Sequence, residues 1–177
     1  GNMFQRPGYD WKRLPVPVIA AIHGHCYGGG LQIALGADIR IAAPDTQMSV
    51  MEIKWGLIPD MSGTQTLRDL VRIDVAKELT FTGRIVEAEE AAQLGLVTRV
   101  AEDPKAAAME LAQTIASKSP DAIRAGKRLF NAVWHGSDVD GLALEAELQQ
   151  TLIGSANQME AVMANMQKRA PKFRDPE

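Results

Sequence analysis

Apolar positions in the first half of the chain switch between the spacing of strands and the spacing of helices. Residues 18–22 form a continuous apolar run, which predicts a strand buried on both faces. Residues 39–43 alternate and predict a second strand that ends at Pro44, while "LQIALGAD" before them has helical spacing. The polar residues 1–15 contain glycine and proline and predict a loop.

Helical spacing alone fills the second half of the chain. Ala108 and Leu111 open an apolar stripe with the i, i+3, i+4, i+7 repeat, and similar stripes follow. The tail from residue 167 is polar, and we expect it to be frayed. The pattern predicts an α/β fold in two parts, a core over residues 1–103 and a helical region over 104–177. The helical region has several apolar faces, which we expect to pack against another subunit.

The composition excludes several classes of protein. The 177 residues are 46% hydrophobic and 23% charged, as in ordinary globular proteins, and the net charge of −3 argues against a nucleic-acid or anionic-membrane binder. Cys26 is the single cysteine, so no internal disulfide and no all-cysteine metal site is possible, and the three histidines lack metal-ligand spacing. No apolar run has membrane-spanning length and no signal peptide is recognisable, so we expect no membrane partner. This profile fits the cytosol or an organelle matrix, and we expect a cytoplasmic protein.

Three consecutive glycines, residues 28–30, stand where a buried strand runs into a helix. Glycine weakens both elements, so bare backbone must be needed there. The spacing fits neither a phosphate-binding loop nor a dinucleotide fingerprint, which leaves an oxyanion hole as the functional interpretation. The glycines by themselves favour the simpler alternative of a tight strand–helix turn without a ligand.

Several ordered motifs around these glycines resemble the crotonase superfamily of enoyl-CoA hydratases and isomerases. The matching segments are "PVIAAIHG", "GGG", "ADIRIA", E-x-x-x-G-L-I-P, "GTQTL" and "KELTFTGRIVEAEEAAQLGLVTRV". The likeness runs from residue 11 to about residue 170. It implies a spiral of β-β-α turns, a helical C-terminal trimerisation region, and a homotrimer or a dimer of trimers. The N-terminal part of that fold is expected to be absent from these residues.

The resemblance also implies the chemistry. The substrate would be an acyl group carried as a coenzyme A thioester, with no bound cofactor and no metal. Gly29, the middle glycine, would donate its backbone N–H to the oxygen of a thioester enolate. The second donor would come from a segment nearer the N-terminus of the family fold.

Two positions separate the hydratases from the isomerases of the family. Hydratases use two glutamates, and here Gln32 stands at the first while Glu52 matches the second. An amide orients a group but is no general base, so the sequence retains one carboxylate. That favours a double-bond isomerase acting on an enoyl- or dienoyl-CoA. A hydratase in which Gln32 only holds the water is the alternative, and a non-catalytic acyl-CoA binding or assembly protein is a further one.

Asp60 matches an aspartate of the family's dienoyl-CoA isomerases. It is expected to act as a second acid–base group or to raise the pKa of Glu52 by like-charge repulsion. Capping of the helix that begins near Ser62 is an equally good interpretation. The resemblance places the remaining substrate-binding residues along the acyl or pantetheine path, and with Gln32 they are His25, Tyr27, Gly28 and Met51.

Overall fold

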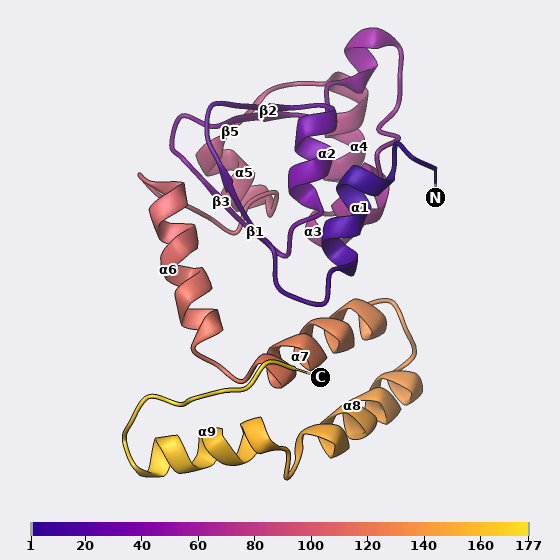
Figure 1. Ribbon diagram of the computed structural model, residues 1–177. Helices are drawn as coiled ribbons and strands as arrows, with labels where there is room; N and C mark the ends of the chain where they lie inside the picture. The colour runs from indigo at the N-terminus through magenta and orange to yellow at the C-terminus, as the bar shows by residue number, and fades with distance from the viewer. Residues whose placement is uncertain (1, 177) are drawn as a thin grey trace. The chain divides into compact units, whose positions relative to one another are not determined.

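The computed structural model describes residues 2–176, which form two compact units (Figure 1). The first unit contains the residues up to 14 together with 18–110, and the second contains 15–17 and the residues from 111 onward. The division lies inside helix α6, Pro104–Ala116. The two units are described separately.

The first unit holds all the strands. Its elements are α1 (Arg6–Arg13), β1 (Ile19–Ile22), β2 (His25–Tyr27), α2 (Gly29–Leu35), β3 (Ile39–Ala42), β4 (Gln47–Ser49), the 3₁₀ helix η1 (Glu52–Trp55), α3 (Gly63–Leu70), α4 (Ile73–Thr82), β5 (Val86–Glu87), α5 (Ala88–Leu94) and β6 (Arg99–Val100).

Two small sheets are built in turn as the chain advances. One sheet has the order β1-β3-β6 and is parallel, and the other has the order β2-β4-β5 with β2 and β4 parallel. Each turn adds one strand to each sheet before a helical segment follows: β1, β2 and α2, then β3, β4 and η1. This alternation confirms the predicted α/β spiral. Ile19 pairs with Ile39 and Ile22 with Ala42, so the two predicted apolar strands lie side by side.

The core of the first unit lies where α2, α4 and α5 cover these strands (Figure 1). Its least exposed large side chains are Leu31, Ile41, Met48, Leu79, Val86, Leu96 and Val97. One charged residue is buried with them: the Arg40 guanidinium donates to the carbonyl oxygens of Leu96 and Ala37. Burial lowers the pKa of Arg40 to about 10 while nearby Asp38 opposes the shift, so the group stays charged at neutral pH.

The prediction of a loop at the N-terminus was wrong, because residues 6–13 form helix α1. Pro7 lies in the first turn, where a helix tolerates proline because the N–H groups there have no partner. Gly8 is buried where α1 crosses the loop before α3: a Cβ on it would lie 2.4 Å from the carbonyl oxygen of Met61. Proline and glycine are both typical of loops. Here Pro7 suits the start of a helix, and Gly8 allows α1 to pack closely against the loop before α3.

The second unit contains α7 (Pro120–Val133), α8 (Asp138–Leu152) and α9 (Ala156–Met166). The tail after α9 is held and not frayed, which corrects the prediction for it. The Asn157 side chain, 4% exposed, donates to the Arg174 carbonyl and accepts from the Arg174 N–H, and Glu160 pairs with Arg169. No helix among residues 2–176 is long and apolar enough to cross a membrane.

Candidate functional site

Glu52 and Gln32 are joined directly, although twenty residues separate them. Glu52 begins η1 just after β4, and Gln32 lies in α2, where it is 2% exposed. Gln32 Nε2 donates to Glu52 Oε1 over 2.6 Å. The two positions that the family resemblance singles out therefore form one polar pair, in which Gln32 is buried and Glu52 is half-buried.

The amide of Gln32 has a fixed orientation. Its oxygen accepts from the backbone N–H groups of Met61, at 2.8 Å, and Gly63, at 2.9 Å. Two N–H donors require an oxygen there, so the NH₂ group must face Glu52. Gln32 thereby accepts hydrogen bonds from the unpaired backbone N–H groups at the start of α3. This is the capping role that sequence analysis gave as one interpretation of Asp60.

The other oxygen of Glu52 is buried without a partner. Among residues 2–176, Oε2 of Glu52 is the one buried side-chain oxygen or nitrogen that makes no hydrogen bond. Leaving a buried acceptor unpaired costs about 1–3 kcal/mol, so such an atom requires an explanation. A carboxylate oxygen in this state is placed to take up a proton or to accept a hydrogen bond from a ligand.

The glycines bring backbone close to this carboxylate. A Cβ on Gly28 would lie 3.4 Å from Glu52 Oε1, and φ of Gly28 is +50°, a conformation that suits glycine. The N–H of Gly28 donates to the Ser49 carbonyl over 2.9 Å. Gly29 is the first residue of α2, where an N–H has no partner within the helix. Met61 covers it, because a Cβ on Gly29 would lie 2.9 Å from Met61 Sδ.

The other predicted site residues lie around this pair at different places. Met51 is half-buried directly before Glu52, and Tyr27 donates from its hydroxyl to Gln47 Oε1 over 2.7 Å. His25 stacks on Tyr27, with ring centroids 5.1 Å apart, and lines an open hollow over β1 and α2. Asp60 is exposed, and no hydrogen bond or ion pair joins it to Glu52 within residues 2–176.

Cys26 has the properties of a core residue. It lies on the opposite side of β2 from His25 and Tyr27 and is 7% exposed. Burial raises the pKa of the Cys26 thiol to about 11, so it carries almost no thiolate at neutral pH. Burial and protonation thus argue against a nucleophilic role for Cys26 at neutral pH.

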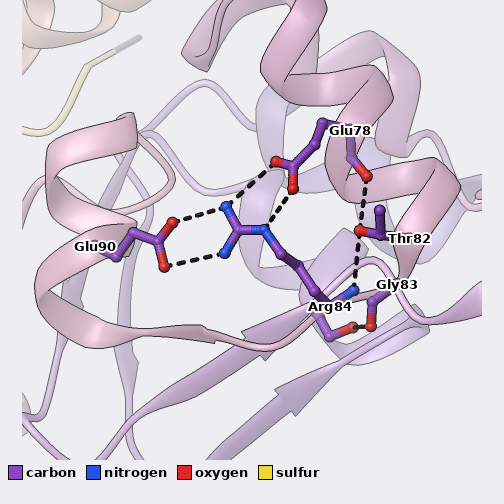
Figure 2. Close-up of polar contacts among 6 residues, drawn as sticks. Glu78, Thr82, Gly83, Arg84 and Glu90 are labelled. Carbon is purple, nitrogen blue, oxygen red and sulfur yellow. Dashed lines mark hydrogen bonds and ion pairs between the residues drawn. The ribbon is translucent and has the colours of Figure 1, made fainter.

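A second polar network, which sequence reasoning missed, is centred on Arg84 (Figure 2). Arg84 binds both oxygens of Glu78 and both oxygens of Glu90, with the shortest contacts at 2.6 and 2.7 Å. Arg84 thus joins α4 to α5 at a corner that contains Gly83. The signal in the sequence is an arginine with an acidic residue six positions away on each side.

The Gly83 corner touches the segment that carries Glu52. Its carbonyl accepts from the Ser49 hydroxyl over 2.8 Å. A Cβ on Gly83 would lie 2.8 Å from Ile53 Cγ2, so only glycine allows this approach without displacement. The corner at Gly83, next to Arg84, therefore packs against both β4 and η1.

Comparison with known proteins gives one consistent family. The profile described as enoyl-CoA hydratase/isomerase matches residues 9–176. Methylglutaconyl-CoA hydratase, mitochondrial, of Mus musculus is 36% identical over 171 residues, which is 93% of this chain and 54% of that protein. Enoyl-CoA hydratase domain-containing protein 2, mitochondrial, of Mus musculus is 41% identical over 169 residues, which is 90% of this chain and 56% of that protein.

Solved structures agree with the sequence relatives. The crystal structure of an enoyl-CoA hydratase from Bacillus anthracis superposes with a TM-score of 0.92 at 35% identity, covering 97% of this chain and 67% of that one. The chain thus spans about half the length of the curated relatives that it matches.

Proposed function

The chain belongs to the enoyl-CoA hydratase/isomerase family. We propose that it is part of an enzyme that shifts a double bond in an enoyl- or dienoyl-CoA, with Glu52 as the proton carrier. The observation that carries this proposal is the unpaired, buried Oε2 of Glu52 beside an amide of fixed orientation. Gln32 presents N–H groups to Glu52 and has no proton to exchange near neutral pH. Glu52 is thus the one member of this pair that is available for acid–base work.

A single carboxylate is sufficient for isomerisation. Glu52 removes a proton from carbon 2 of a 3-enoyl thioester, and the electron pair of that C–H bond forms a dienolate. The same group then returns the proton to carbon 4, so the double bond moves and the enzyme ends as it began. The family resemblance assigns Gly29 to the enolate oxygen, where one such donor contributes about 2.7–4 kcal/mol. The N–H of Gly28 is already bonded to Ser49, whereas the N–H of Gly29 opens α2 without a partner in the helix, and this difference supports the assignment.

The proposal includes a second oxyanion donor, which the family resemblance assigns to a segment nearer the N-terminus of the family fold. The chain covers 54% of the length of the mouse methylglutaconyl-CoA hydratase, so the complete activity is proposed for the whole protein. Asp60 stays a proposed second acid–base group, and its place next to Met61, whose N–H holds Gln32, supports a role at the acyl group.

Hydration is the second candidate function. The two mouse relatives carry hydratase in their names, which favours addition of water to a 2-enoyl thioester. In that reaction Glu52 deprotonates the water and Gln32 only positions it. No specific observation favours the third alternative, a non-catalytic binder or assembly protein.

The experiment that tests the proposal compares two thioesters on the full-length protein. 3-Hexenoyl-CoA reports isomerisation and crotonyl-CoA reports hydration, with products identified by mass and by NMR. We expect faster turnover of 3-hexenoyl-CoA, to the 2-enoyl product. Strong hydration of crotonyl-CoA without isomerisation would replace the isomerase by the hydratase.

Assembly and location complete the proposal. Phe130, Trp134 and Met166 are each more than half exposed in the second unit, which supports association with further copies, as a trimer or a dimer of trimers. A cytoplasmic location stays a prediction, and the organelle matrix is favoured by the two relatives whose names call them mitochondrial.

A further inference from the structure

A polar hollow of about 350 Å³ lies between α1 and the loop that leads into α3. One face of α1 contributes Arg6, Tyr9 and Arg13, and the opposite wall contains Asp60, Ser62 and Gln65. The α1 residues are spaced three and four apart, so they share one side of the helix. Most of the residues that line the hollow thus carry hydrogen-bonding side chains.

The hollow begins one residue away from the hydrogen bonds of the Glu52 site. Asp60 and Ser62 line it, and Met61 between them donates its N–H to Gln32. Gly8 brings α1 against this loop, because it packs against the Met61 carbonyl and the Ser62 hydroxyl. An acyl group that reaches past Gly29 and Met61 would therefore meet this lining next.

The charges of the hollow are only partly neutralised. Arg6 pairs with Asp10 over 3.1 Å on the same helix. Arg13, in the last turn of α1, has no ion pair and no side-chain hydrogen bond within the part of the chain that the structure describes. Asp60 is likewise unpaired there. The hollow thus offers one open cation on α1 and one open anion on the loop, and an anionic ligand group is attracted to the α1 side.

From this arrangement we propose that the acyl group of the substrate ends in a carboxylate, which Arg13 binds. This inference rests on the proposed function, because it names the substrate class of the Glu52 site. An arginine binds a carboxylate through two parallel N–H···O bonds, which a methyl end cannot accept. The methylglutaconyl group in the name of one relative is an acyl group of this kind.

Binding of two saturated thioesters of equal chain length tests the proposal. Hexanedioyl-CoA and hexanoyl-CoA differ only in a terminal carboxylate in place of a methyl group, and calorimetry on the full-length protein gives both dissociation constants. We expect hexanedioyl-CoA to bind about tenfold more tightly, as one charge-assisted contact allows. Arg13→Gln removes that preference and leaves hexanoyl-CoA binding unchanged, while Arg13→Lys retains part of it.

Lys77→Gln is the matched control, because it removes one exposed positive charge from α4, outside the hollow. Equal affinities for the two thioesters, or an Arg13→Gln variant that weakens both equally, would overturn the inference and leave the proposed function standing. If neither thioester bound, the proposed function would fail together with it.

Discussion

The first unit contains two polar networks that differ in burial and in completeness. The Glu52–Gln32 pair joins a buried amide to a half-buried carboxylate, carries one charge and leaves one buried carboxylate oxygen unpaired. The Arg84 network is about one-third to one-half exposed, and all four carboxylate oxygens of Glu78 and Glu90 are bonded. The complete network joins α4 to α5, whereas the incomplete one retains a carboxylate oxygen that can accept a hydrogen bond from a ligand. Of the two networks, the one with the unpaired carboxylate oxygen is therefore the candidate for reactivity.

The largest expected effect is on turnover, from Glu52→Gln. The amide fills the same volume and still accepts from Gln32, but it has no basic oxygen at the Oε2 position. We expect kcat to fall about 10²- to 10⁴-fold, the usual contribution of a general acid–base group, with thioester binding retained. Steady-state kinetics measures the loss, and Glu89→Gln on the exposed face of α5 is the control. Full activity in the Glu52 variant would remove Glu52 from the mechanism.

Gln32→Leu breaks the buried network through its other partner. The change leaves Glu52 Oε1 and the N–H groups of Met61 and Gly63 without a partner in a buried place. We expect the free energy of unfolding to fall by at least about 2 kcal/mol, since each unpaired group costs about 1–3 kcal/mol. Denaturant titration measures it, and an unchanged midpoint would contradict the geometry.

Gln32→Glu serves as the matched variant for Gln32→Leu. It retains the oxygen that accepts from Met61 and Gly63 but puts a second carboxylate oxygen beside Glu52 Oε1. Two carboxylates at that distance share a proton, so activity should depend on pH with a higher apparent pKa than in the wild type. An unshifted pH profile would mean that the two side chains are further apart in solution.

Cys26 tests whether the interior near the Glu52 site excludes water. Its pKa is raised to about 11 in the folded state, above the ordinary value of 9.0. Below pH 9 both states hold the proton, but between pH 9 and 11 only the unfolded state releases it, so stability falls as pH rises. We expect about 1 kcal/mol of loss near pH 10, at 1.36 kcal/mol per pKa unit. Chemical denaturation at pH 8 and pH 10 should show less of this loss in Cys26→Ala.

The smallest effect is expected from Arg84→Gln, because solvent screens its ion pairs. We expect a loss of about 1 kcal/mol or less in low salt, and a smaller loss in high salt. The accompanying change in kcat should be modest, since Gly83 keeps its bond from Ser49. Arg72→Gln is the control, whose exposed partner Asp74 follows two residues later. A loss larger than that of Gln32→Leu would reverse the comparison of the two networks.

Sequence patterns predicted what depends on local apolar spacing. Both apolar strands and the strand–helix turn at the glycines are present. The prediction that the first strand is buried on both faces was wrong, because within β1 Ile22 is buried but Ala21 is exposed. Helix α1 was missed because its proline and glycine were interpreted as helix breakers. The sequence does not show that the glycine is needed where α1 packs against the Met61 carbonyl. The orientation of Gln32 was not predictable, since it depends on two N–H groups about thirty residues away. The Arg84 network likewise joins two helices that no local pattern connects.

Proton transfer in D₂O tests the central claim most directly. The full-length protein would convert 3-hexenoyl-CoA to the 2-enoyl product, with the isotope at carbon 4 followed by NMR. If Glu52 carries the proton in a site closed to water, part of the hydrogen taken from carbon 2 reappears at carbon 4, and Glu52→Gln forms the product about 10²- to 10⁴-fold more slowly. Complete deuteration at carbon 4 would contradict a carrier shielded from water, and product formation by the variant at the wild-type rate would contradict Glu52 as that carrier.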